Sequence, residues 1–210
     1  MKKLIFRFNS KVSQRSLDKK NILGGKGANL AEMGRLGLPV PPGFTISTKV
    51  CDYFFSNNKK LPKKLISEVK KELRIIEKIV GKKFGDLSKP LLVSVRSGAR
   101  VSMPGMMDTI LNLGLNDETI QALIQQTSNK RFVNDCYRRF IQMYSNVVLG
   151  IEGHLFEELI ENYKLTKGVI QDIELDENDW NGLIQNFKEL VKSKTKKKFP
   201  QDVNEQLIEA

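Results

Sequence analysis

Apolar residues recur with the period of an α-helix in much of this chain, and the clearest example is the stretch 62–80. Spacings of three and four residues place them on one side of a helix, while the lysines fall largely on the other sides. The pattern therefore predicts a long amphipathic helix that ends near Gly81. Its apolar positions are Leu65, Val69, Leu73, Ile76 and Val80.

The first sixty residues mix short strand patterns with shorter helices. The run LPVPPGF separates them and cannot be helical, because each proline lacks a backbone N–H and favours an extended predecessor. The predicted elements are a strand at 3–8, a polar loop at 10–20, a helix from about Gly27 to Leu36, a strand at Phe44–Ser47 and a helix, capped by Ser47 or Thr48, to about Phe55.

The strongest strand pattern is Leu91–Ser97, with the sequence LLVSVRS. We expect a buried strand that ends at Arg96 and opens into a loop containing Gly98 and Gly105. A strand end of this kind is a usual place for a ligand site in mixed α/β folds.

From Asp117 onward the pattern predicts helices alone, with Asn116 or Asp117 as the first cap. The sequence thus predicts an α/β part over 1–115, a helical subdomain over 116–200 and the start of a return segment over 201–210. The expected helices cover 117–126, 130–149, 153–163, 177–194 and 203–208. In the second of these the apolar side is Phe132, Cys136, Phe140, Met143 and Val147.

The charge balance raises the question of a nucleic-acid partner, since 35 Lys and Arg against 24 Asp and Glu give a formal net charge of +11. The lysines are dispersed over helix faces, however, and aromatic residues do not interleave with them as stacking on bases would require. The densest run, KSKTKKK at 192–198, is typical of a helix end that enters a solvated turn. We therefore expect neither nucleic acid nor, without a long apolar run, a membrane as partner.

The cysteines and the histidine carry little chemical signal. Cys51 and Cys136 form no CxxC pair, which favours free thiols that are buried or half-buried. His154 opens a helical stretch and is expected to be a surface residue. No export signal is visible, so that the cytoplasm is the expected location.

The first candidate site is the glycine cluster LGGKGANL at residues 23–30, directly before a predicted helix. Glycines allow a close approach of the backbone to a phosphate, the helix start supplies N–H groups, and Lys26 adds a full positive charge. The spacing differs from that of a P-loop. A tight turn that needs glycine, with Lys26 merely solvated, is an equally good interpretation.

The second candidate site is the run SVRSGAR at 94–100 with SMPGMMDT at 102–109. A guanidinium at the end of a buried strand needs an anionic partner, either a carboxylate of the chain or a ligand phosphate. Gly105 and Met107 belong to a loop suited to covering a nucleotide, although methionines also fill gaps between subdomains. No nucleophilic triad, carboxylate pair or metal cluster accompanies these motifs.

At these residues the chain resembles the pyruvate phosphate dikinase family. ILGGKGANLAEMGRLGLPVPPGFTIST at 22–48 is similar to the family's opening motif, which phosphoenolpyruvate synthases share in a looser form. VSVRSGARVSMPGMMDTILNLGLND at 93–117 is similar to pyruvate phosphate dikinases in particular. The resemblance continues to KFPQDVNEQL at 198–207, where Val203 and Asn204 replace the family's usual Pro and Trp.

The resemblance implies an ATP-grasp-type nucleotide-binding domain that passes phosphoryl groups from ATP to a histidine, which then delivers one to pyruvate. Lys26 and Arg96 would meet the ATP phosphates, and Gly105 and Met107 would close over the nucleotide. The Mg²⁺ ligands and the phosphorylated histidine are expected in the complete enzyme and not in this chain, and the complete enzyme is expected to be a homodimer. ATP, pyruvate and phosphate are the implied partners.

The leading hypothesis is therefore an N-terminal ATP-binding fragment that makes no phosphoenolpyruvate alone. The alternative is a shortened, non-catalytic remnant or a nucleotide-binding regulatory module. If Arg96 serves ATP, we expect its side chain to be inaccessible and to lack a carboxylate partner in the ligand-free chain.

Overall fold

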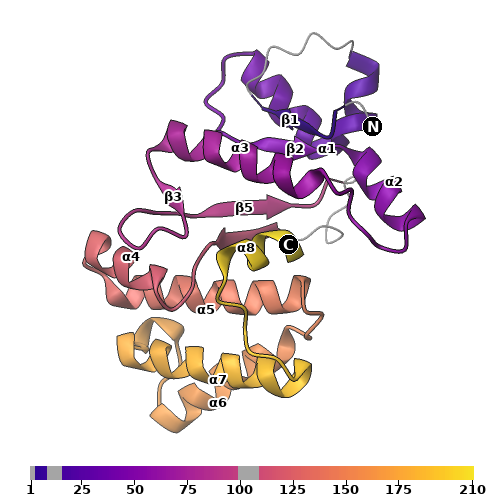
Figure 1. Cartoon of the computed structure of the whole chain (residues 1–210). Helices are drawn as coiled ribbons and strands as arrows, with labels where there is room; N and C mark the ends of the chain where they lie inside the picture. Colours follow the sequence, from indigo (N-terminus) through magenta and orange to yellow (C-terminus); the bar gives the residue numbers. More distant parts are fainter. Residues whose placement is uncertain (1–2, 9–15, 99–108) are drawn as a thin grey trace. The chain divides into compact units, whose positions relative to one another are not determined.

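The computed structural model describes residues 3–8, 16–98 and 109–210 and shows a mixed helix and sheet fold with small sheets (Figure 1). Its contacts divide the described residues into two compact units. The first unit holds the residues up to Gly81 and those from Arg96 to Gly98, and the second holds Lys82–Val95 and Thr109–Ala210. No helix of the described residues is long and apolar enough to cross a membrane.

The first unit is built on a two-stranded antiparallel ribbon, which we call the β1–β2 ribbon. Its register pairs Ile5 with Ile46 and Arg7 with Phe44. The elements of the unit are β1 (Ile5–Arg7), α1 (Ser16–Arg35), β2 (Phe44–Ile46), α2 (Thr48–Ser56) and α3 (Leu65–Val80). The predicted strands and the last two helices are thereby confirmed, with Ser47 as the cap of α2 and Gly81 at the end of α3.

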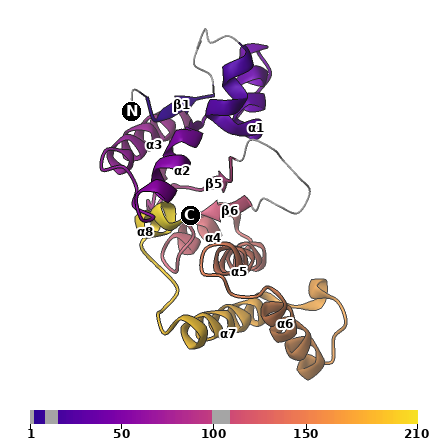
Figure 2. The same cartoon turned by 90° about the vertical axis from the view of Figure 1, so that its right-hand side faces the viewer.

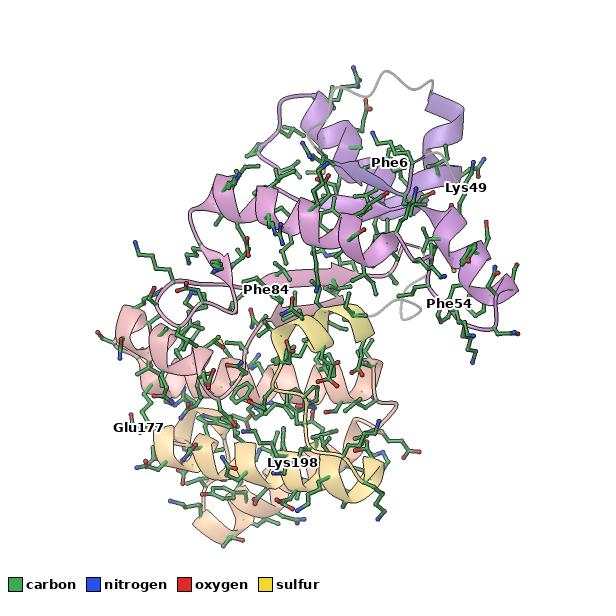
Figure 3. All side chains as sticks on the ribbon, in the orientation of Figure 1. Phe6, Lys49, Phe54, Phe84, Glu177 and Lys198 are labelled. Atoms are coloured by element: carbon green, nitrogen blue, oxygen red, sulfur yellow. The ribbon has the colours of Figure 1, made fainter. Side chains whose placement is uncertain are left out.

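The two faces of the β1–β2 ribbon meet different helices, because successive side chains of a strand alternate between faces. Phe6, labelled in Figure 3, packs with Leu23 and Ala28 of α1 in a buried cluster. On the other face Arg7 forms a bidentate ion pair with Glu72 of α3, with Nη2 at 3.1 Å from Oε1. The face of the ribbon that holds Phe6 therefore packs against the part of α1 that contains the glycine cluster.

The second unit has two small sheets and a layer of helices. β3 (Lys83–Phe84) pairs in parallel with β4 (Pro90–Leu91), and β5 (Val93–Arg96) pairs with β6 (Thr109–Leu113). The helices are α4 (Thr119–Thr127), α5 (Lys130–Val147), α6 (His154–Lys167), α7 (Glu177–Thr195) and α8 (Val203–Glu209), with a 3₁₀ turn at Asp172–Glu174. As predicted, the structure contains helices and no strand from Asp117 onward, where every residue is described.

The core of the second unit lies between α5 and α7, which are neighbours in both views (Figures 1 and 2). Trp180 and Phe187 of α7 and Phe140 and Tyr144 of α5 are essentially inaccessible. Gln206 of α8 is also fully buried, because its amide group hydrogen-bonds three backbone groups. These are the N–H of Gly114 and the carbonyls of Leu115 and Pro200. Val203, which is also buried, and Gln206 thus fix the last helix.

Three details of the structure differ from what the sequence predicts. Residues 16–20, predicted as loop because the segment is polar, begin α1 instead. Leucine and lysine, which supply three of these five residues, are good helix formers. Cys51 is exposed instead of buried, whereas Cys136 is half-buried, which raises the pKa of its thiol. The strand predicted at 91–97 is split by Leu92 into β4 and β5.

Candidate phosphate-binding site

Gly24 breaks α1 into two helical segments at the predicted glycine cluster. Its backbone, with φ 70° and ψ 171°, lies in a region that only glycine occupies without strain. The residue is buried, so that the break belongs to the packed part of the first unit. A new helical segment then begins with Gly25 and Lys26 and continues to Arg35.

The start of this second segment offers the chemistry that a phosphate needs. The first N–H groups of a helix have no partner within it, and they carry the positive end of the helix dipole. Lys26 lies in this first turn and is only half-buried, so that part of the residue is accessible. We call residues Gly24–Gly27 the glycine turn.

Gly27 brings the glycine turn close to the β1–β2 ribbon. A Cβ atom at Gly27 would lie 2.8 Å from both Oγ1 and Cγ2 of Thr45, which is closer than real Cβ contacts allow. Glycine is thus required here for the close approach of helix to strand, in addition to the unusual backbone of Gly24. The predicted tight-turn function of the glycines is confirmed, and it is compatible with anion binding.

The junction between β2 and α2 holds the other side of the glycine turn. The hydroxyl of Thr48 donates a 2.5 Å hydrogen bond to the carbonyl of Asn21, in the last turn before the break. Ser47, which precedes it, is buried and donates its N–H to the carbonyl of Leu4 at 2.8 Å. The junction is therefore anchored on β1, at the edge of the ribbon.

Arg96 does not have the buried position that the sequence predicts, because its side chain is exposed at the end of β5. This strand alternates half-buried Val93 and Val95 with exposed Ser94 and Arg96, as a sheet of two strands leaves one face uncovered. Among the described residues Arg96 has no carboxylate partner within ion-pair distance. The expectation of inaccessibility was therefore wrong.

The two predicted motifs approach each other in the first unit. A Cβ atom at Gly98 would lie 3.9 Å from the carbonyl oxygen of Leu23, the residue before the break. The backbone that follows Arg96 thus passes beside the glycine turn, as a shared site requires. Gly105 and Met107, the other predicted nucleotide-binding residues, lie outside the described residues.

Elsewhere in the described residues, neither the cavity beside α3 nor the acidic side chains suit a phosphate or a metal as well. A cavity of about 250 Å³ lies between the ribbon and α3, but apart from the Arg7–Glu72 pair its lining is mainly apolar, with Ile75, Ile76 and Ile79. It offers a phosphate few donors. No group of three or more His, Cys, Asp or Glu side chains in 3–8, 16–98 and 109–210 is arranged to hold a metal ion.

Comparison with known proteins places both motifs in one family. The model of the family described as pyruvate phosphate dikinase, AMP/ATP-binding domain, matches residues 20–66 and 56–141, which together exceed half of the chain. The chain belongs to this family. The glycine turn, Thr48 and Arg96 all lie within the matched residues.

Relatives of the family match almost the whole chain. Pyruvate, phosphate dikinase of Rhizobium meliloti is 47% identical over 207 residues, which are 99% of this chain and 23% of the relative. The protein of Entamoeba histolytica is 50% identical over 188 residues, 90% of this chain and 21% of the relative. The chloroplastic protein of Flaveria pringlei is 50% identical over 206 residues, which are 98% of this chain and 21% of the relative. The chain thus spans between a fifth and a quarter of the length of these relatives.

Sequence reasoning singled out the glycine cluster as a candidate site but missed the residues that contact it. Thr45 and Thr48 were visible only as part of a strand and as a helix cap, and their contacts with α1 depend on how the chain folds back. The pair Gly24-Gly25 was the available signal for a break, because two adjacent glycines seldom persist inside a helix.

Proposed function

We propose that this chain is the N-terminal ATP-binding part of a pyruvate phosphate dikinase, with an ATP-grasp-type fold. In the complete enzyme it would use ATP and phosphate to phosphorylate a histidine on the way from pyruvate to phosphoenolpyruvate. The observation that carries the proposal is the helix start at the glycine turn with an accessible Lys26, in a chain of the AMP/ATP-binding domain family.

In this proposal the chain's residues position and neutralise phosphate groups, which is most of what phosphoryl transfer asks of a protein. The N–H groups after Gly24 would donate to phosphate oxygens, and the Lys26 ammonium would balance their charge. Arg96 would bind as a planar fork with two donors, and its exposure leaves it free to do so. Gly105 and Met107 would close over the nucleotide. Mg²⁺ would supply further charge neutralisation at the phosphates.

A chimera tests this proposal without requiring that the chain be active alone. The chain would replace the matching 23% of the Rhizobium meliloti relative, and formation of phosphoenolpyruvate from pyruvate, ATP and phosphate would be measured. We expect an active chimera. Arg96→Ala should lower histidine phosphorylation about a hundredfold, the scale of losing a transition-state donor. Lys26→Ala should act similarly but more mildly, because a flexible ammonium is a point charge.

The controls separate charge and folding from function. Lys71→Ala removes an exposed lysine of α3 and should leave the chimera's rate unchanged. Arg96→Ala should also leave the free energy of unfolding nearly unchanged, because the side chain is exposed. A folded chimera that fails to phosphorylate its histidine would contradict the proposal and favour the alternative, a non-catalytic remnant. Normal rates in both site variants would refute the residue assignment alone.

A further inference from the structure

The break in α1 leaves the last carbonyl groups of the first helical segment without partners within the helix, just before the N–H groups that we propose as phosphate donors. A helix that ends leaves its last carbonyl groups without partners within the helix, just as a helix that begins leaves N–H groups. The first segment of α1 ends at the break, so that the carbonyl of Asn21 lies among these last groups. Without a partner, this end would fray, and the glycine turn attached to it would lose its fixed direction.

Thr48 supplies that partner from a rigid support. Its hydroxyl donates to the Asn21 carbonyl at 2.5 Å, across 27 residues of sequence. Thr48 is the first residue of α2. Ser47 before it donates its N–H to the carbonyl of Leu4, the residue before β1, and its hydroxyl accepts from the N–H of Lys49 at 3.3 Å. The hydroxyl therefore comes from a point that β1 holds in place.

A second threonine of the same segment holds the glycine turn on its other side. The side chain of Thr45 lies directly against Gly27, where no Cβ atom would fit. Thr45 thus limits the position of the turn after the break, and Thr48 fixes the helix before it. One contact before Gly24 and one after it thus define the direction of the N–H groups between them.

We propose that Thr48 is a positioning residue for the glycine turn, which aims the turn's N–H groups and Lys26 at a phosphate without touching the ligand. This inference rests on the proposed function, since it assigns a residue to the same phosphate site. It predicts that the hydroxyl of Thr48, and not the packing of its methyl group, governs affinity for the phosphate part of a nucleotide.

Three variants isolate the hydroxyl. Thr48→Val keeps the shape and removes the donor, and Thr48→Ser keeps the donor. Thr166→Val is the matched control in the second unit, because Thr166 makes a comparable bond of 2.9 Å to the carbonyl of Asn162 in α6. The probes are ATP and inorganic pyrophosphate, each titrated by calorimetry into the 210-residue chain.

Thr48→Val should weaken the binding of both probes by roughly three- to tenfold, the usual effect of one hydrogen bond. The loss should be equal for both, because it acts on the phosphate donors. Thr48→Ser should restore affinity to within about twofold, and Thr166→Val should leave it unchanged. Hydrogen exchange should show faster exchange of the Gly24–Ala28 amides in Thr48→Val alone.

The outcomes distinguish this inference from the proposed function. Wild-type affinity and wild-type exchange in Thr48→Val would overturn the positioning role of Thr48, whatever the site binds. If the wild-type chain binds neither probe, the proposed site fails, and the exchange of Gly24–Ala28 still decides whether Thr48 holds the turn. Equal loss of affinity in Thr48→Val and Thr48→Ser would also contradict the inference, because the hydroxyl would then not be the cause.

Discussion

Single residues decide the geometry of the candidate site. Gly24 breaks α1 with a backbone that other residues adopt only under strain, and Gly27 allows the next turn to lie against Thr45. The two glycines have different physical tasks, one in backbone conformation and one in close packing. Lys26 between them is thereby held at a helix start.

Replacing Gly24 by alanine should therefore damage both folding and binding. We expect Gly24→Ala to lower the free energy of unfolding by about 1–3 kcal/mol, the cost of a disfavoured backbone region, and to abolish measurable ATP binding. Gly37→Ala is the control for backbone strain away from the site, because Gly37 also has positive φ, 77°, and its Cβ would meet open space. It should lose some stability and keep the wild-type ATP affinity. Urea unfolding and calorimetry would measure both effects. Equal ATP affinity in the two variants would show that the break at Gly24 is not required for binding.

The exposure of Arg96 is a property that the local sequence does not predict. A β-branched run indicated a strand correctly, but whether that strand is buried depends on how many strands pair with it. The sequence contains no signal for the size of a sheet, so that the exposure of Arg96 could not be predicted. Its identity as a candidate phosphate residue does not depend on burial and stays a prediction.

At the scale of elements, the helices could be placed from their periodicity, but their buried sides could not always be. In α5 the predicted apolar side began at Phe132, which is 54% exposed, whereas Tyr137 and Ile141 are fully buried. The helix contacts α4, α7 and β6, so that it is covered on more than one side. Tyr137 is acceptable in the core because its hydroxyl donates to Asp117 at 3.1 Å, a tertiary contact that spacing does not reveal.

The connection between β3 and β4 gives the chain a defined pH response. The carboxylate of Asp86 accepts hydrogen bonds from the N–H of Lys89 and from the hydroxyl and N–H of Ser88, which lower its pKa to about 2. An unfolded chain has an Asp pKa of about 3.9. The folded state thus binds this proton more weakly, and the stabilisation by Asp86 is present above about pH 4 and lost as the pH falls to about 2.

We expect Asp86→Asn to flatten the pH dependence of stability between about pH 4 and 2, because the amide does not titrate. Urea unfolding at several pH values would measure the free energy of unfolding. Glu158→Gln, which removes an exposed carboxylate of α6, should keep the wild-type slope. An identical slope in wild type and Asp86→Asn would show that the hydrogen bonds of this connection do not favour the charged carboxylate.

At the scale of the whole molecule, composition predicted the change from mixed structure to helices but not the grouping of the contacts. The compact units assign Lys82–Val95 and β6 to the helical part, whereas the predicted border lay near Leu115. The reason is packing within the second unit, where β6 contacts α5 and α8 and β4 contacts α4. Contacts between residues far apart in sequence decide such grouping, and periodicity reports only on neighbours.

The resemblance supplied what physical reasoning from the residues left open. From the residues alone, a phosphate site at the glycine cluster and a merely structural turn were equally good interpretations. The structure shows that Gly24 and Gly27 are structurally needed and that Lys26 is only half-buried, an arrangement that is compatible with the proposed phosphate site. The family match favours AMP or ATP as the ligand that we propose for this turn.

The central claim, that the glycine turn and Arg96 form one phosphate site, is tested most directly by amide NMR of the chain during titration with ATP. We predict saturable shifts of the Gly24–Ala28 and Arg96–Gly98 amides, which inorganic pyrophosphate reproduces and Lys26→Ala weakens, while Lys71→Ala leaves them unchanged. Shifts confined to the lysine-rich faces of α3 and α7, or no saturable shift at the glycine turn, would contradict the claim.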